Sequence, residues 1–335
     1  MTETKSVAYR QEILFLYEAK DCNPNGDPLD ENRPRTDPET GVATVTDVRI
    51  KRTVRDYLLS KEPDEKKRLQ SGMEILIRDT IKEDGFLAEG KDRADQFLEE
   101  ASKGKKGKEK VNAIQEAILK GCIDARLFGS TLPVEKGSLK LTGPVQFTAF
   151  NRSLHKVAHQ LIQQTAAFAG NAKASQKSFA ERQILSYALI AAYGVVNEVA
   201  ARTTQLSDAD VSLLLEGLWH GTASLNTHSK MGHHPLLLVR ISYSNGKRIG
   251  VLPERISLLK EKRGDSEIED TAIRSTQDYK LDVKHLLDAV LMVGEAVTGI
   301  DVHEEPRLIC VDGNEQGTFS NVASNRGIKV NPLSL

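Results

Sequence analysis

A short apolar run followed at once by a stiff polar loop constrains the fold of this chain most. Residues 13–19 read Ile-Leu-Phe-Leu-Tyr-Glu-Ala, and a run this short and bulky predicts a buried strand. Residues 21–46 hold four prolines and two glycines, which predicts a loop. Residues 47–60 predict a helix that begins at Thr46 or Asp47. A strand, a rigid loop and a helix therefore follow one another within the first sixty residues.

The composition of the chain argues against several classes of protein. The chain has 335 residues and a formal net charge of −1, so any nucleic-acid signal has to come from local clusters. Cys22, Cys122 and Cys310 are far apart, which argues against a disulfide framework or a thiolate zinc site and indicates a reducing, cytoplasmic setting. The first residues form no apolar signal core, and polar residues interrupt the apolar stretch 184–201, so we expect no membrane span.

The remaining elements mix without a regular βαβ alternation. Residues 61–121 are charged and helix-prone, residues 139–150 predict strands around a Gly-Pro turn, and residues 151–183 are polar and small, as in a projecting arm. Further elements are expected as a helix at 206–220 opened by Ser207, a strand at 236–243 and a helix at 283–298. This mixture favours an α+β fold.

The helix predicted at residues 47–60 carries a cluster of cations. On a helical wheel, Lys51, Arg52 and Arg55 fall on one face, beside the apolar stripe. No acidic residue lies four positions after Lys51 or Arg55, so we expect these cations to be unpaired and suited to phosphate contact. The alternative is an ordinary solvated face.

The preceding loop resembles half of a calcium site. Asp21, Asn23, Asn25 and Gly26 match the first half of a calcium-binding loop, but position twelve is Asn32 where that loop needs a bidentate glutamate. We therefore expect no metal here.

An anion-binding loop is the better interpretation of the same residues. Gly26 permits a positive φ and a close approach of backbone N–H groups to an oxyanion. Asn23 and Asn25 offer hydrogen bonds to bases or ribose, and Arg33 and Arg35 add charge downstream. A stiff surface loop capped by its asparagines is the alternative.

The histidines give no metal or catalytic site. His155 and His159 lack the glutamate of a zinc-protease helix, and His228, His233 and His234 have no cysteine or carboxylate close by in sequence. No nucleophile motif is present, so we expect neither a cofactor nor a catalytic residue.

Several segments together resemble a known family. The chain resembles the repeated backbone subunit of type I CRISPR surveillance complexes (Cascade), of the RAMP superfamily, in the branch of subtypes I-B and I-C. The likeness is densest over residues 13–60 and 122–155. It is carried by Asn23-Pro24-Asn25-Gly26-Asp27-Pro28, Asn32-Arg33-Pro34-Arg35 with Asp37-Pro38-Glu39-Thr40-Gly41, Val45-Thr46-Asp47-Val48, Asp124-Ala125-Arg126-Leu127-Phe128-Gly129, Gly143-Pro144-Val145-Gln146 and Asn151-Arg152-Ser153-Leu154.

The resemblance implies a fold and an assembly. It implies one hand-shaped domain over residues 1–335, with an RNA-recognition-motif-like (ferredoxin-like) palm, helical fingers at 61–121 and a thumb at 151–183. Copies of such a subunit stack head to tail along the spacer of one CRISPR RNA in the cytoplasm. Together with other Cascade subunits they present the guide for pairing with target DNA in antiviral defence. The subunit itself is not an enzyme.

The resemblance also implies which residues contact RNA. It implies that Lys51, Arg52 and Arg55 of the basic helix contact phosphates, and that the stiff loop lines the RNA groove with Asn23, Asn25, Gly26, Arg33 and Arg35. Near the base of the thumb it implies contacts by Gln146, Arg152 and Ser153, and on the thumb it implies that Phe168 stacks on a base. A second wall of the groove would be formed by His228, Ser229, Lys230 and Met231.

Two other functions stay open at this point. Related backbone subunits of type III complexes cut RNA with a loop aspartate and a metal, for which Asp21 or Asp27 would be the candidates here. A protein-interaction domain that binds no RNA is the third interpretation.

Overall fold

The computed structural model describes residues 6–81, 92, 97, 107–134, 137–169 and 177–335. The helices are α1 (Asp47–Lys61), α2 (Glu65–Ser71), α4 (Gly107–Gly121), α5 (Ile123–Phe128), α6 (Glu198–Thr204), α7 (Asp208–Ala223), α8 (Lys284–Val293) and α9 (Phe319–Asn325), with short 3-10 turns η1 (Leu252–Arg255), η2 (Asp270–Ala272), η3 (Thr276–Asp278) and η4 (Gly294–Ala296).

The longer strands build the sheets and the shorter ones form small ribbons. They are β1 (Arg10–Cys22), β2 (Gly26–Asp27), β3 (Arg33–Pro34), β4 (Val42–Thr46), β5 (Gly129–Val134), β6 (Gly137–Thr142), β7 (Val145–Phe147), β8 (Phe150–Lys156), β9 (His159–Ala169), β10 (Lys177–Val196), β11 (His233–Tyr243), β12 (Ser257–Lys260), β13 (Lys262–Arg263), β14 (Ser266–Glu267), β15 (Tyr279–Asp282), β16 (Val297–Glu304), β17 (Cys310–Asp312), β18 (Glu315–Gly317) and β19 (Asn331–Pro332).

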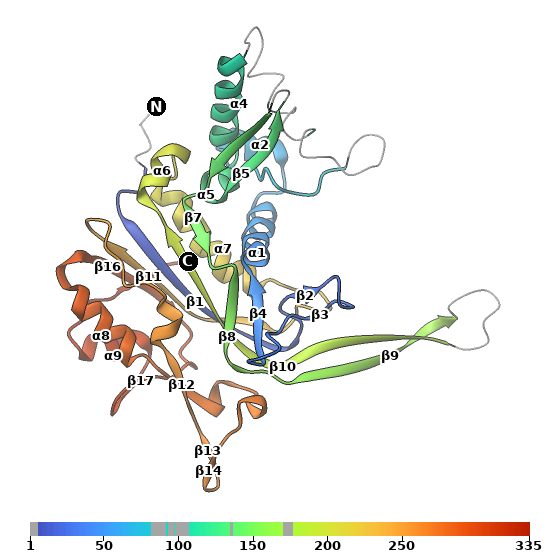
Figure 1. The fold of residues 1–335 in the computed structure, drawn as a ribbon, viewed down its shortest axis with the longest axis vertical. Helices are drawn as coiled ribbons and strands as arrows, with labels where there is room; N and C mark the ends of the chain where they lie inside the picture. Colours follow the sequence, from blue (N-terminus) through green and yellow to red (C-terminus); the bar gives the residue numbers. More distant parts are fainter. Residues whose placement is uncertain (1–5, 82–91, 93–96, 98–106, 135–136, 170–176) are drawn as a thin grey trace.

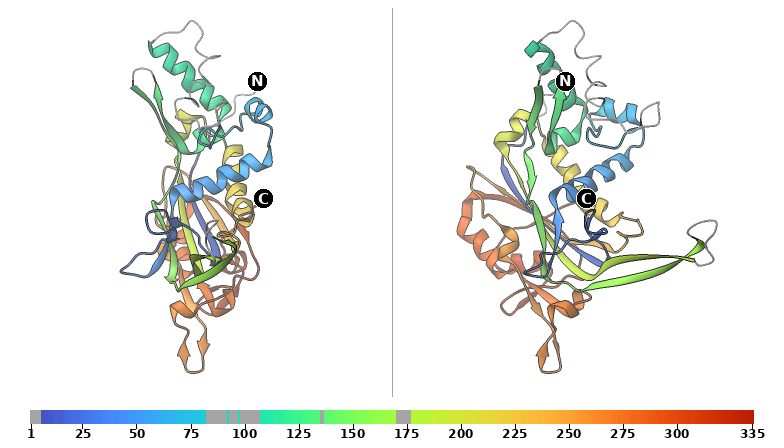
Figure 2. Two further views of the ribbon diagram at one scale, coloured as in Figure 1. Left: turned by 90° about the vertical axis from the view of Figure 1, so that its right-hand side faces the viewer. Right: turned by 45° about the vertical axis from the view of Figure 1, so that its right-hand side comes forward.

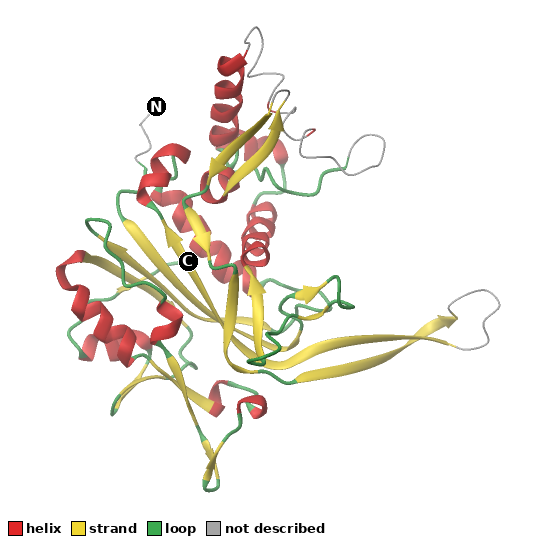
Figure 3. Cartoon of the chain, in the orientation of Figure 1, coloured by secondary structure: helices red, strands yellow, loops and turns green. Residues whose placement is uncertain are grey.

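A central sheet organises the chain. Its strand order is β19-β16-β11-β1-β10-β8-β4, with β7 and β9 also paired to β10. Figure 3 shows the strands in yellow. The strands β11, β1, β10 and β8 are all antiparallel to their neighbours. Residues 11–19 of β1 are all buried, as expected of a strand covered on both faces.

Different parts of the chain cover the two faces of the sheet. The helices α1 and α7 pack on one face, where Phe15 of β1 shares an apolar cluster with Val54 and Leu218. The parts of the C-terminal segment that lie outside the sheet, among them η1, α8 and α9, cover the other face, where Leu14 shares an apolar cluster with Leu286 and Phe319 (Figures 1 and 2). The protein is therefore an α+β fold, as the sequence predicted, and it has three layers.

Two buried glutamates of β1 hold the C-terminal segment to the sheet. Glu12 accepts hydrogen bonds from the backbone N–H groups of Ile249 and Gly250, both at 2.9 Å. Glu18 is paired with Arg307 at 2.6 Å and accepts from the Tyr187 hydroxyl at 2.9 Å. Buried carboxylates are costly unless they are paired in this way, so these contacts fix how the segment docks.

The long strands β9 and β10 form a hairpin that projects from the sheet (Figure 1). This hairpin starts at His159, whereas we expected residues 151–183 to project. Residues 151–156 lie in β8 within the central sheet, and alternate side chains there are buried. The polar composition misled the prediction, because Asn151 and Ser153 use their polar atoms to bond neighbouring backbone.

Most of the other predicted elements are confirmed. The side chain of Thr46 caps α1, and Ser207 and Asp210 form a capping box at the start of α7. The region predicted as loop also contains β4, and α8 ends at Val293, before the predicted end at residue 298. All three cysteines are buried, and none of them forms a disulfide.

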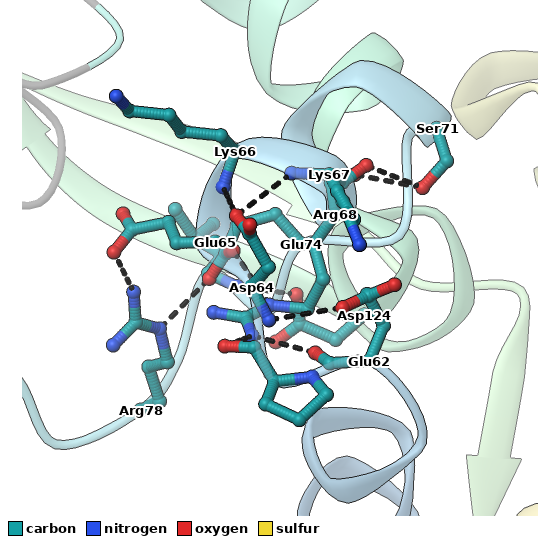
Figure 4. A network of polar contacts seen from close by, with 12 residues as sticks. Glu62, Asp64, Glu65, Lys66, Lys67, Arg68, Ser71, Glu74, Arg78 and Asp124 are labelled. Atoms are coloured by element: carbon teal, nitrogen blue, oxygen red, sulfur yellow. Dashed lines mark hydrogen bonds and ion pairs between the residues drawn. The ribbon is translucent and has the colours of Figure 1, made fainter.

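The expected helical insertion, residues 61–121, contains α2 and α4, and much of residues 82–106 lies outside the described residues. At its base the Arg68 guanidinium donates to Glu74 at 2.9 Å and to the carbonyl groups of Glu62 and Pro63, while Arg78 also reaches Glu74 (Figure 4). The hairpin β5–β6 packs on α4 through a separate apolar cluster.

A second buried ion pair ties α1 to this region. Asp124 of α5 is fully buried, accepts from Arg55 at 2.9 Å, and accepts from the backbone N–H groups of Leu76 and Ile77 at 2.7 and 3.1 Å. One carboxylate therefore joins three segments.

We predict that Asp124→Ala lowers the free energy of unfolding by about 3–5 kcal/mol, because it leaves a buried guanidinium and two N–H groups unpaired. Chemical denaturation would measure the loss. The matched control is Asp79→Ala, which removes an exposed partner of Arg52 and should cost less than about 1 kcal/mol. Equal losses in the two variants would contradict the prediction.

Candidate nucleic-acid interface

The two asparagines of the stiff loop serve first as internal braces. The Asn25 side-chain oxygen accepts from the backbone N–H and the hydroxyl of Thr46, at 2.8 and 2.9 Å, which joins the loop to the start of α1. Asn23 is buried, and its amide donates to the Asn32 carbonyl at 2.7 Å. The loop is therefore held in one shape by its own amides.

Gly26 is required for a different reason from the one we expected. Its φ is not positive; the positive values nearby belong to Asp21, Glu31 and Asn32, at 50°, 50° and 56°. A Cβ on Gly26 would lie 1.9 Å from the Asn32 side-chain oxygen. The prediction of a positive φ was wrong, and close packing against Asn32 explains the glycine.

The prediction that the helix presents three unpaired cations was also wrong. Lys51 is paired with Asp47 at 2.8 Å, and Arg52 is paired with Asp56 at 2.7 Å. We expected an ion-pair partner only four residues after Lys51 or Arg55. The actual partners are Asp47, four residues before Lys51, and Asp56, four residues after Arg52.

Arg55 differs from the other two cations because it is buried. Its side chain is 10% exposed and is held by Asp124, which is distant in sequence, and its guanidinium lies over the Phe128 ring. Its position is explained by packing and by the ion pair, so we remove it from the candidate phosphate contacts.

The two loop arginines remain near the surface. Arg33 is exposed beside Asp30 and Glu31, at 3.6 and 3.3 Å, and Arg35 is paired with Asp27 at 3.1 Å. These pairs are partly or well exposed to solvent, where an ion pair contributes little, so a phosphate could replace the carboxylate at small cost.

The candidates near the hairpin base separate into exposed and buried residues. Gln146 is exposed and lies 3.5 Å from the Lys51 ammonium, and Arg152 is exposed on β8. Ser153 is buried, and its hydroxyl accepts from Ala43 N at 2.8 Å, so it stabilises the sheet and we remove it from the candidate contacts. Phe168 lies in β9, and its side chain is outside the described residues.

The structure brings the stiff loop against the segment His228–Met231, which is far from it in sequence. Asn23 N donates to the Ser229 carbonyl at 2.8 Å, and the Lys230 ammonium donates to the Asn23 carbonyl at 2.5 Å. Arg182, at the root of the projecting hairpin, donates to the His228 carbonyl at 3.0 Å. Two predicted walls of one groove, and the hairpin root, are therefore adjacent.

Arg49 is a functional candidate that we underrated, because it lies at the edge of the basic helical face. Arg49 lines a small hollow that is partly open to solvent, and its guanidinium donates to the Thr53 hydroxyl at 3.0 Å. Burial lowers the pKa of Arg49. In the sequence, the feature that pointed to Arg49 was its position at the edge of the basic face of the predicted helix.

Burial also lowers the pKa values of two neighbouring groups, Lys230 and His233. The pKa of Lys230 falls to about 8, because burial disfavours the ammonium and the positive charge of Arg49 adds to that effect. The pKa of His233 falls to about 4, again mainly through burial, so the imidazole is neutral at pH 7.

Two observations on the described part of the chain concern metal ligands and membrane-spanning helices. Within it no three metal-ligating side chains come together. No helix there is both long and apolar enough to cross a membrane.

The fold defines a class of protein. It is similar to a chain of a solved structure described as "CRISPR RNA-guided surveillance complex, pre-nicking", with a TM-score of 0.51 and 13% identity over 95% of this chain and 98% of that chain. A chain of a second "CRISPR RNA-guided surveillance complex" gives a TM-score of 0.50, with the same identity and coverage. The architecture is thus that of a subunit found in such complexes.

Sequence comparison places the chain more narrowly. The family model for "CRISPR-associated protein Cas7" matches residues 9–284. The CRISPR-associated protein Cas7 of Haloferax volcanii is 32% identical over 327 residues, which cover 91% of this chain and 90% of that relative. The chain belongs to the Cas7 family of CRISPR-associated proteins, and the family resemblance noted in the sequence is confirmed.

We predict that Asn25→Ala lowers the free energy of unfolding by about 1–3 kcal/mol, because Thr46 loses the acceptor for its N–H and its hydroxyl. Asn25→Asp keeps an acceptor oxygen at the helix start and should lose less. Thermal or chemical denaturation would compare the two. A greater loss for Asn25→Asp than for Asn25→Ala would show that the contact to Thr46 is not what stabilises the loop.

Proposed function

We propose that this protein is a non-catalytic CRISPR RNA-binding backbone subunit of a type I Cascade complex that acts in the cytoplasm. The observation that carries the proposal is the meeting of the stiff loop, the segment His228–Met231 and the root of the projecting hairpin on one surface of a Cas7 family chain. A subunit that holds any spacer needs such a continuous surface for the RNA backbone.

The topology supports an RNA-recognition-motif-like palm. The sheet order β11-β1-β10-β8, with α1 following β1 and α7 preceding β11 on one face, corresponds to a ferredoxin-like arrangement. Residues 61–121 would then be part of the fingers. The projecting hairpin within residues 151–183 would be the thumb, rooted at His159 and Leu185.

The proposed RNA contacts go to phosphate and ribose and avoid base edges, because the spacer sequence varies. Among the cations of this surface, Arg33, Arg35, Lys51 and Arg52 are paired with carboxylates. Where such a pair is exposed to solvent, a phosphate can displace the carboxylate at little cost. With the buried Asn23, Arg55 and Ser153 removed, the proposed contact residues are Asn25, Gly26, Arg33, Arg35, Lys51, Arg52, Gln146, Arg152, Phe168, His228, Ser229, Lys230 and Met231.

Head-to-tail stacking of copies fits the formal net charge of −1. A subunit that meets its own copy needs acidic and basic surfaces of similar extent. Other Cascade subunits and the target DNA paired to the guide are the remaining partners.

A metal-dependent ribonuclease is the function to exclude by experiment. Asp27 accepts from Leu29 N at 3.1 Å and pairs with Arg35, as a turn-capping residue does. Asp21 is exposed, with a φ of 50°. We expect no cleavage when the assembled complex is incubated with complementary RNA and magnesium. Site-specific cuts that disappear in Asp27→Ala or Asp21→Ala would overturn the proposal.

We predict that a shortened hairpin keeps the fold and single-copy RNA binding but prevents ordered multimers. Gln164 and Ala180 are paired across β9 and β10, so joining them through Asn-Gly preserves the register. Electron microscopy and native mass measurement on a long RNA would compare this variant with the intact chain. Normal filaments from the shortened chain would contradict a thumb role for the hairpin.

A further inference from the structure

The projecting hairpin of β9 and β10 leaves the central sheet at a bend in β10 (Figure 1). An irregularity lies on each side of β10 at this bend. On one side, Asp21 of β1 lies opposite the bend and has a φ of 50°. On the other side, five steps along β10, from Ile190 to Leu185, are matched by six steps, from Ser153 to His159. An extra residue on one side of a ladder, as in a β-bulge, bends the strands.

Beyond the bend, the described part of the hairpin is a ribbon of two strands. Residues 177–185 of β10 pair with β9, and the pairing of β10 with β1 begins at Leu185. A two-stranded ribbon is marginally stable on its own, so its direction depends on contacts at its root. The side chains of His155 and Arg182 make two such contacts.

His155, near the end of β8, replaces a backbone acceptor in the ladder at the bend. Its Nε2 accepts from the backbone N–H of Leu189 at 3.3 Å, and its Nδ1 donates to the Lys156 carbonyl at 2.7 Å. The residue is 3% exposed, and its ring stacks on that of Tyr187 with the centroids 5.8 Å apart. Burial lowers the pKa of His155, so the imidazole is neutral at pH 7 and Nε2 remains an acceptor.

The two neighbours of this ring are themselves held by the packed layers of the protein. The hydroxyl of Tyr187 donates to Glu18 at 2.9 Å and lies 2.7 Å from the hydroxyl of Tyr279. The backbone N–H of Lys156 donates to Asp270 of η2 at 3.1 Å. His155 therefore connects the start of the hairpin to β10 and to the C-terminal segment.

Arg182 makes its contact on the other side of β10. Its guanidinium donates to the His228 carbonyl at 3.0 Å. The segment of His228 is bound to the end of β1, because the backbone N–H of Asn23 donates to the Ser229 carbonyl at 2.8 Å. Since β1 and β8 pair with opposite edges of β10, the hairpin is held from both edges.

We propose that His155 and Arg182 are positioning residues that fix the angle at which the hairpin leaves the central sheet. The inference rests on the proposed function, in which the hairpin reaches the next copy of the chain. A fixed angle then sets the spacing of successive copies along the RNA, because every copy presents its hairpin in the same direction. It also reduces the conformational entropy that is lost when the hairpin meets its neighbour.

The first test measures the direction of the hairpin in the full chain without RNA. Nitroxide labels are attached to cysteines introduced at exposed positions, since the native cysteines are buried. One label is at Gln163 on β9 and the other at Ser212 on α7 or Lys284 on α8, which cover opposite faces of the sheet. Gln163 pairs with Glu181, five residues beyond Ser186, so at about 3.3 Å per residue its label lies about 16 Å from the bend, and a swing of about 20° moves it by about 5 Å. Double electron–electron resonance measures each distance and its spread.

Two variants each remove one contact. His155→Phe keeps a ring against Tyr187 but removes the acceptor for Leu189, and His155→Gln supplies an acceptor again. Arg182→Met keeps an apolar stem and removes the donor. We expect His155→Phe and Arg182→Met to shift the label distances, or to widen their spread, by about 5 Å, the displacement of a strand that swings at the bend. His155→Gln should restore the distances, and the matched control Arg202→Met, at an exposed arginine of α6, should leave them unchanged.

Thermal unfolding shows whether each variant is folded. Arg182 is partly exposed, so Arg182→Met keeps the inference falsifiable if His155→Phe does not fold. Unchanged distances and spreads in a folded variant would overturn the role of the residue that it replaces.

The second test uses multimers assembled on a long RNA. We expect electron microscopy to show regular spacing between copies of the intact protein and irregular spacing in Arg182→Met. Regular spacing in a variant whose hairpin has shifted would overturn the link between the hairpin angle and the spacing. If the intact protein forms no multimers on RNA, the proposed function fails, whereas the label distances still decide whether His155 and Arg182 fix the hairpin.

Discussion

The covering of β1 on both faces is the constraint on which the rest of the structure depends. A strand buried on both sides needs one layer from α1 and α7 and another from the C-terminal segment. Glu12 and Glu18 then have to find partners inside the protein, and they find them in Ile249, Gly250 and Arg307. Because β1 runs directly into the stiff loop, the same packing that buries the strand also fixes where the candidate RNA surface begins.

Local signals in the sequence predicted the elements of this fold but not their contacts. The apolar run of β1, the Thr46 cap and the Ser207 capping box are properties of a few neighbouring residues, and each is confirmed. The true start of the hairpin was missed because Asn151 and Ser153 are polar yet buried through bonds to backbone groups of other strands. Polarity predicts exposure only where no such acceptor or donor is available.

In the candidate site, too, the contacts between residues distant in sequence could not be predicted. The sequence identified both loops that meet at Asn23 and Ser229, but their contact depends on tertiary packing. It also selected Arg55 as a free cation, because Asp124 lies 69 residues away. Whether a cation is free depends on where every carboxylate goes once the chain is folded. A wheel of one helix therefore could not separate Arg55 from Arg49.

The length of β10 has a mechanical consequence. Its twenty residues run without interruption from the hairpin, through the pairing with β1, to the edge near β7. At about 3.3 Å per residue, this strand is about 65 Å long along its path, and it bends where the hairpin leaves the sheet (Figure 1). A load applied to the hairpin travels along the strand into the ladder with β1 and is resisted by many hydrogen bonds at once. A neighbouring copy that pulls on the hairpin would therefore pull on the centre of the sheet.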